Sequence, residues 1–229
     1  VQKLAIILPE EVGLLRGMSP AAIRYFVAGV LERTRTRGGV YHPLLDQYLG
    51  EQGLWFMLTK KIQPLLSPFH KNSPRFPKFL AEGSPRGVFD AYTARDGQVT
   101  WYVDWAQRTL HEALGGHDIN DLYRQVVVVL EQEGLLKAVA SGKHKAYGIL
   151  AEVLQVTKET AGIQCRVCGH KLTVPAAQLP DWLENQCLSY RCQGRYEQES
   201  TFGQRYYRQV YERGQVERIF PHEHTGLLS

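Results

Sequence analysis

The sequence predicts an α+β protein with a mostly helical N-terminal part, a small cysteine-rich module and a terminal β-strand segment. Three observations predict this class. Apolar residues recur at helical spacing after Ser19, helix-like and strand-like patterns follow one another over residues 98–158, and all four cysteines lie between positions 165 and 192. These changes of pattern divide the chain into residues 1–97, 98–158, 159–200 and 201–229.

The first well-signalled helix lies in "MSPAAIRYFVAGVLERTRTRGGV". Ser19 is a typical N-cap residue, and Pro20 suits the first helical position because its missing N–H has no partner there. Apolar residues then recur on one face of the helix. The Gly38–Gly39 pair predicts its end, since glycine readily adopts the left-handed backbone that follows a helix.

The next segment predicts less regular structure. Residues 42–66 predict two short helices interrupted near Gly50 and Gly53. Residues 67–97 are rich in Pro, Gly and Ser and predict a long surface loop, which in a compact domain is often functional. A winged-helix-like unit over residues 20–65 is a further hypothesis.

Residues 98–158 predict a winged-helix module. "TWYVDWAQRTLHEAL" and "INDLYRQVVVVLEQEGLL" have helical spacing, and "KAVASGKHKAYGILAEVLQV" contains two strand-like runs around a Ser-Gly-Lys turn. Helix, helix and β-hairpin follow one another in the order of that motif. The run of four valines indicates that the second helix is largely buried, so packing against protein is an alternative to contact with nucleic acid.

The cysteines predict a zinc ribbon over residues 159–200, because Zn²⁺ prefers four tetrahedral thiolate or imidazole ligands. A structural site is favoured, since four thiolates leave no open position for water. Replacement of one cysteine ligand by His170, and redox or free thiols, are the alternatives. The spacer between the two pairs is long enough for a short strand pair. The expected ligands, in Cys-x2-Cys and Cys-x4-Cys pairs, are Cys165, Cys168, Cys187 and Cys192.

Basic residues predict a nucleic-acid contact, because cations neutralise phosphates and interleaved aromatic rings can stack on bases. The stretch from Gln52 to Ala81 has no acidic residue. The alternative is a solvated basic loop whose phenylalanines pack inward. The candidate residues in this loop, in the second helix of the winged-helix module and in its hairpin are Lys60, Lys61, Lys71, Arg75, Lys78, Arg124, Lys143 and Lys145.

Composition narrows the class of protein further. The net charge of +4 permits a nucleic-acid partner without requiring one. No apolar run approaches the roughly 20 residues that a membrane-spanning helix needs, so no membrane association is expected. The clustering of all cysteines in one segment differs from a disulfide scaffold and favours a reducing, cytoplasmic setting. No Walker A or other recognised hydrolase motif occurs, so whether the chain is an enzyme stays open.

The end of the chain, "VERIFPHEHTGLLS", resembles the second motor domain of superfamily 2 DEAD/DEAH-type helicases, in which a strand leads to a short His- and Gly-bearing motif. It is most similar to large bacterial helicases in which a winged-helix-like region and a four-cysteine zinc ribbon precede an "EHTGLL" segment. Both ATPase halves are missing from this chain. The resemblance implies an accessory insertion, with ATP bound only by the parent protein. The matching motif residues are Glu223, His224, Thr225 and Gly226.

This resemblance leads us to expect a nucleic-acid-binding accessory module of an ATP-dependent DNA helicase. The module would not be catalytic by itself, and its partners would be single- or double-stranded DNA and the motor domains of the same parent chain. Residues 201–229 would lead into the missing motor domain. One alternative is a stand-alone adaptor that uses a winged helix and a zinc ribbon for protein–protein contacts in a transcription or defence complex. Another is a metal-dependent enzyme that uses His222 and His224.

Overall fold

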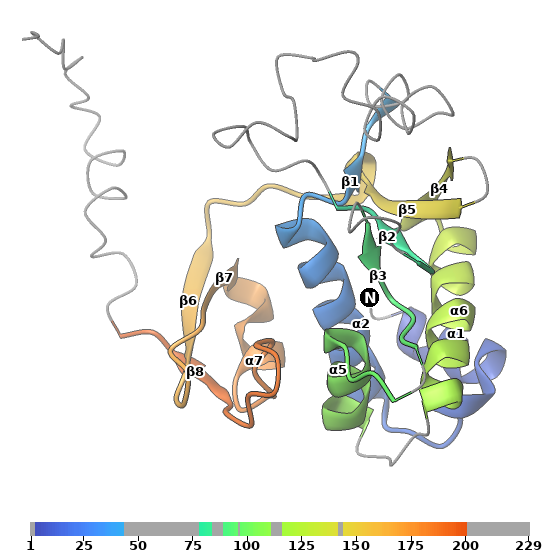
Figure 1. Ribbon diagram of the computed structural model, residues 1–229. Coiled ribbons are helices and arrows are strands. Elements are labelled where there is room, and N and C mark those ends of the chain that lie inside the picture. The colour runs from blue at the N-terminus through green and yellow to red at the C-terminus, as the bar shows by residue number, and fades with distance from the viewer. Residues whose placement is uncertain are drawn as a thin grey trace, which may run out of the picture.

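The computed structural model of the protein describes residues 3–43, 78–83, 89–95, 97–110, 116–141 and 144–200. Within these ranges the structure is α+β and has two β-sheets (Figure 1). Each described helix falls short of the length or the apolar character that crossing a bilayer requires. The two short helices predicted after His42 and the β segment predicted for residues 201–229 lie outside the described residues.

The main body combines helices with the larger sheet (Figure 1). Its helical elements are α1 (Leu4–Glu11), the 3-10 turn η1 (Gly13–Leu15), α2 (Pro20–Thr36), α5 (Trp101–Leu110) and α6 (Gly116–Gln132). Its strands are β1 (Val40–Tyr41), β2 (Leu80–Ala81), β3 (Asp90–Ala91), β4 (Leu136–Ser141) and β5 (His144–Leu150), and the 3-10 turn η4 (Ala151–Val153) follows β5.

Helix α2 begins and ends where the sequence predicts. The Ser19 hydroxyl accepts a hydrogen bond from the Ala22 backbone N–H at 3.2 Å, which satisfies one of the unpaired donors of the first turn. The helix ends at Thr36, and Gly38 adopts a left-handed φ of 78°. The apolar face that contains Phe26 and Val30 is buried in the core.

Strand β5 is the centre of the larger sheet. It pairs antiparallel with β4 along one edge, and with β1 and β2 in succession along the other, while β3 pairs parallel with β2. The predicted order of helix, helix and hairpin is present as α5, α6, β4 and β5. Strands from both sides of residue 97 share this sheet, so the segments 1–97 and 98–158 are joined by backbone hydrogen bonds.

The prediction of a surface loop over residues 67–97 is wrong for the part of this segment that the structure describes, residues 78–83, 89–95 and 97. Phe79 and Leu80 are almost fully buried, and β2 and β3 lie within this segment. Each strand is two residues long, too short for an alternating pattern to appear in the sequence. The strands are stabilised by pairing with the distant strand β5, which local composition does not reveal.

A buried carboxylate joins β3 to the helices. Asp90 accepts hydrogen bonds from the Arg33 guanidinium at 2.9 and 3.1 Å, from Arg37 at 3.2 Å and from the Tyr102 hydroxyl at 2.9 Å. The Arg33 guanidinium also lies 4.5 Å from the ring centre of Trp101. A buried carboxylate needs such partners, because desolvation of an unpaired charge is costly.

Helices α2 and α5 approach each other closely at Gly29. The indole N–H of Trp105 donates to the Phe26 carbonyl at 3.0 Å, and a Cβ placed on Gly29 would lie 2.1 Å from the Trp105 ring. Glycine therefore stands inside a helix, where it is normally unfavourable, because any side chain would overlap the indole.

Replacing Gly29 with alanine is expected to destabilise the protein by about 1–2 kcal/mol, because overpacking outweighs the gain in helix propensity. Urea unfolding followed by circular dichroism measures this difference. Gly13→Ala is the matched control, because a Cβ at Gly13 meets no atom within 4 Å, and its free energy of unfolding should stay the same or rise. Equal stability of Gly29→Ala and wild type would contradict the close approach.

The cysteine-rich module lies beside α2 and α5 (Figure 1). Its strands are β6 (Thr160–Cys165), β7 (Lys171–Pro175) and β8 (Tyr196–Gln198), with β6 in the centre. The predicted strand pair between the cysteine pairs is wrong. Only β7 lies there, followed by η5 (Ala176–Gln178) and the short helix α7 (Leu179–Trp182), because Pro180 suits the first turn of a helix and not a paired strand.

Candidate metal centre

The four cysteine sulfurs converge on one point. Their Sγ atoms all lie within 4.8 Å of one another, although the pairs are separated by β7 and α7. The sulfur of Cys165 lies 3.7 Å from that of Cys192, and the sulfur of Cys168 lies 3.6 Å from that of Cys187. A tetrahedral ion with metal–sulfur bonds of about 2.3 Å places its ligand sulfurs about 3.8 Å apart. The four cysteines could therefore hold a metal ion.

Backbone amides surround the sulfurs. The N–H of Val167 points to the Cys165 sulfur at 3.4 Å, and the N–H of Gly194 points to the Cys192 sulfur at 3.4 Å. The N–H of Ser189 points to the Cys187 sulfur at 3.3 Å. We call the backbone turn at each cysteine pair a knuckle, so residues 165–168 form the first knuckle and residues 187–192 form the second. Donors that face sulfur stabilise the thiolate form, which is the form that binds a metal.

Two glycines allow the knuckles to form, for different reasons. Gly169 has a φ of 71°, a left-handed conformation that follows the first pair of cysteines and favours glycine. Gly194 has no such backbone, but a Cβ there would lie 2.4 Å from the Cys165 sulfur. The first glycine therefore provides a turn, and the second provides space next to a clustered sulfur.

His170 is not part of the sulfur cluster. Its Nδ1 lies 2.8 Å from the Tyr196 hydroxyl, which also accepts a hydrogen bond from the Leu188 N–H at 3.0 Å. Tyr196 is fully buried beneath the second knuckle. The alternative in which His170 replaces a cysteine ligand is therefore not supported, and the imidazole instead helps to position the loop that carries two of the ligands.

The thiols differ in acidity. Burial raises the pKa of Cys192 to about 12, and burial also raises the pKa of Cys165 above its usual value. Burial would raise the pKa of Cys168 too, but hydrogen bonds with Ser189, the His170 backbone and neighbouring sulfurs lower it to about 6. At neutral pH Cys168 is thus the first thiolate available, and Cys165 and Cys192 must release protons to become ligands.

Metal affinity is therefore expected to fall on acidification. At least two protons, from Cys165 and Cys192, leave when the metal binds at a pH below their raised pKa values. The apparent dissociation constant should then rise at least about 100-fold for each unit of pH lost between pH 8 and 6. Competition with a chromogenic chelator at several pH values measures this slope. A slope near zero would show that the cluster does not bind metal through these thiols.

Arg108 of α5 joins the second knuckle to the main body. One guanidinium nitrogen donates to the carbonyls of Cys187 at 2.7 Å and Cys192 at 2.9 Å. A second nitrogen donates to the Ser189 carbonyl at 3.2 Å. Arg108 is buried and forms an ion pair of 2.8 Å with Asp104 one turn earlier, and the same carboxylate accepts the Arg191 N–H at 3.0 Å. The guanidinium thus fixes the backbone of two of the clustered cysteines.

Further contacts extend this interface along the same loop. The Trp101 indole donates to the Leu188 carbonyl at 2.6 Å, and the Tyr25 hydroxyl donates to the Gln186 carbonyl at 2.6 Å. The rings of Tyr25 and Trp182 pack edge to face with centres 5.4 Å apart. The sequence reasoning missed these residues. The only signal is the placement of Asp104 and Arg108 four residues apart in a largely apolar helix.

The candidate nucleic-acid-binding residues are only partly described. Lys78 is half-buried at the start of β2, and Lys145 is exposed on β5. Arg124 is exposed on α6 but pairs with Glu82 at 2.7 Å and with Asp121. Glu82 directly follows β2, whose Ala81 pairs with Ala146 next to Lys145, so an acidic residue lies near both cations. The candidates outside the described residues are Lys60, Lys61, Lys71, Arg75 and Lys143.

These features define the class of protein as an α+β protein with a four-cysteine centre that could hold a metal ion. Comparisons of the chain with protein-family models, with curated proteins and with solved structures find no match. The motif residues Glu223, His224, Thr225 and Gly226, on which the helicase resemblance depends, lie outside the described residues.

Proposed function

We propose that the chain is a nucleic-acid-binding accessory module of an ATP-dependent DNA helicase, non-catalytic by itself and carrying a structural Zn²⁺. The observation that carries the proposal is the direct attachment of a four-cysteine centre to a helix–helix–hairpin unit through Arg108. The helicases that the sequence resembles have these parts in the same order. In the winged-helix interpretation α6 is the second helix and the β4–β5 hairpin is the wing.

Zn²⁺ is the ion that best suits this donor set. Four thiolates at tetrahedral spacing are typical of zinc or of iron–sulfur centres, and paired knuckles with amide N–H groups facing sulfur are typical of structural zinc. Since all four coordination positions would be occupied by protein sulfur, the ion would stabilise the fold without activating water. Reduced thiolates also favour the cytoplasm as the setting of the proposed module.

Purified chain should contain about one zinc per molecule, bind DNA in a salt-dependent manner and hydrolyse no ATP. Elemental analysis, fluorescence anisotropy with labelled oligonucleotides from 25 to 200 mM salt, and a phosphate-release assay measure the three properties. Absence of DNA binding at low salt would disprove the nucleic-acid role. ATP hydrolysis by the pure chain would disprove the accessory role.

The second candidate is an adaptor that makes protein–protein contacts, and the pairing of Arg124 favours it. Because Glu82 and Asp121 neutralise this cation, the exposed face of α6 offers little net positive charge to a phosphate backbone. An adaptor would bind a protein partner with an affinity that is insensitive to an excess of competing DNA. If DNA displaces the protein partner, or binds the chain more tightly than the partner does, the result would favour the helicase module.

A further inference from the structure

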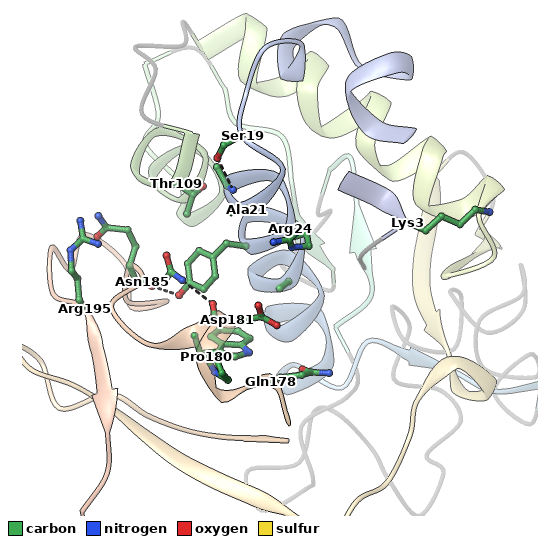
Figure 2. Close-up of a pocket in the computed structure, with 15 residues that line it drawn as sticks. Lys3, Ser19, Ala21, Arg24, Thr109, Gln178, Pro180, Asp181, Asn185 and Arg195 are labelled. Carbon is green, nitrogen blue, oxygen red and sulfur yellow. Dashed lines mark hydrogen bonds between the residues drawn. The ribbon is translucent and has the colours of Figure 1, made fainter. Parts of the chain in front are cut away.

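A groove separates α2 from the cysteine-rich module and lies next to the docked second knuckle (Figure 2). Its volume is about 740 Å³, within the range of roughly 300–1,000 Å³ that is typical of ligand sites. Its walls come from the N-terminal half of α2 and from the segment that runs from η5 through α7 to Arg195. Tyr25 and Gln186, which are joined by a hydrogen bond of 2.6 Å, both line it.

Positive charge predominates in the groove. Arg24 from α2, Arg195 from the cysteine-rich module and Lys3 line it, and Asp181 is the single carboxylate among the lining residues described. Lys3 is engaged by Glu133 at 2.8 Å, whereas Arg24 forms no hydrogen bond or ion pair with a described residue. Arg195 uses one nitrogen on the Glu184 carbonyl and retains further N–H donors. The groove therefore offers two guanidinium groups to an anion.

One of the lining residues, Gln186, carries a buried acceptor. The side-chain oxygen of Gln186 is shielded from water, and no described residue donates a hydrogen bond to it. The backbone carbonyl of the same residue is satisfied by Tyr25. Buried amide oxygens are normally hydrogen-bonded, because an unsatisfied one costs about 1–3 kcal/mol. An N–H or O–H donor on a bound molecule would satisfy this oxygen.

We infer that this groove binds a strand of single-stranded nucleic acid, with Arg24 and Arg195 on backbone phosphates and the Gln186 oxygen accepting an N–H from a base. The inference rests on the proposed function and assigns its binding site. Anionic groups and N–H donors occur together in nucleotides. Their Watson–Crick edges are free only in an unpaired strand, and a groove of this size does not admit a duplex.

The test measures binding of the full chain to a labelled single-stranded oligonucleotide by fluorescence anisotropy over a range of salt. Removing both guanidinium groups in Arg24→Gln/Arg195→Gln should weaken binding at least 10-fold. It should also reduce the slope of log affinity against log salt by about 1.4, because each phosphate contact on a single strand contributes about 0.7. Gln186→Leu should weaken binding several-fold and leave the salt slope unchanged.

Arg16→Gln/Lys158→Gln is the matched control, because it removes the same charge from two exposed positions that do not line the groove. It should change affinity less than 2-fold. Zinc content and the unfolding midpoint confirm that each variant is folded. Crosslinking of a bromouracil-labelled strand gives a second measurement, and the labelled peptides should come from α2 and residues 178–195.

The outcomes separate the groove from the function. If the wild type binds nucleic acid and Arg24→Gln/Arg195→Gln lowers the affinity no more than the control does, the groove assignment fails. The proposed nucleic-acid role then remains. Equal affinity for duplex and single strand, or crosslinks that all lie outside α2 and residues 178–195, would overturn it in the same way. If the wild type binds neither single-stranded nor duplex nucleic acid at 25 mM salt, both the proposed function and the groove assignment fail.

Discussion

Replacing Cys187 with serine is expected to remove the bound metal and unfold the cysteine-rich module. Cys187 is fully buried between the Arg108 contact and the other sulfurs, so the site cannot substitute another ligand. A structural zinc site contributes about 10–16 kcal/mol in small zinc-dependent domains, and residues 160–200 contain few large apolar side chains that could replace it. Zinc per chain should fall from about one to near zero.

Hydrogen exchange locates this effect. Amides of β6, β7 and β8 should lose protection, whereas those of α6 should keep it, because Val126, Val127 and Leu130 are fully buried on a helix that carries none of the cysteines. Thr173→Ala is the control, because this side chain is exposed on β7 and lies outside the sulfur cluster, and it should retain metal. Full metal content in Cys187→Ser would show that the cluster is not the metal site.

Replacing Arg108 with methionine is expected to destabilise the protein by roughly 3–5 kcal/mol, because it leaves Asp104 charged and buried without its partner. Three carbonyl groups of the second knuckle lose their donor at the same time. The loop that carries Cys187 and Cys192 is then no longer held, so the metal should dissociate faster. Urea unfolding and the rate of zinc transfer to a chelator measure the two effects.

A double-mutant cycle separates the charge pair from the carbonyl contacts. Asp104→Asn/Arg108→Met removes the uncompensated carboxylate and should recover part of the stability, but zinc transfer should stay fast because the carbonyls remain without a donor. Arg108→Lys keeps the charge but lacks the planar fork that reaches three carbonyls, so it should show intermediate transfer rates. Wild-type zinc transfer in Arg108→Met would show that α5 does not position the ligands.

Local signals in the sequence predicted much of the main body. Ser19 and Pro20 specify the start of α2 through backbone chemistry that involves only the next few residues. The order of α5, α6 and the β4–β5 hairpin follows from periodicity in consecutive segments. The clustering of the four cysteines was also predictable, because two closely spaced pairs of thiols in one chain are typical of a metal site.

Contacts between distant segments could not be read in this way. Strands β2 and β3 are too short to show a pattern, and they form because β5 provides an edge about 65 residues later in the chain. The short helix α7 replaced an expected strand because Pro180 and packing of Trp182 on Tyr25 favour a turn of helix. The groove exists only because two segments about 160 residues apart are held together at Tyr25 and Gln186.

By itself, the sequence determined the α+β class, the main helices and the four cysteines that could hold a metal ion, since each depends on residue type and spacing over a short stretch. Only the tertiary structure decided that His170 is outside the cluster and that Arg108 holds the knuckle. It also decided that Arg24 and Arg195 line one groove. The physical reason is that burial and hydrogen-bond geometry depend on which distant surfaces meet, and a hydrophobic pattern specifies that a face is buried without specifying its partner.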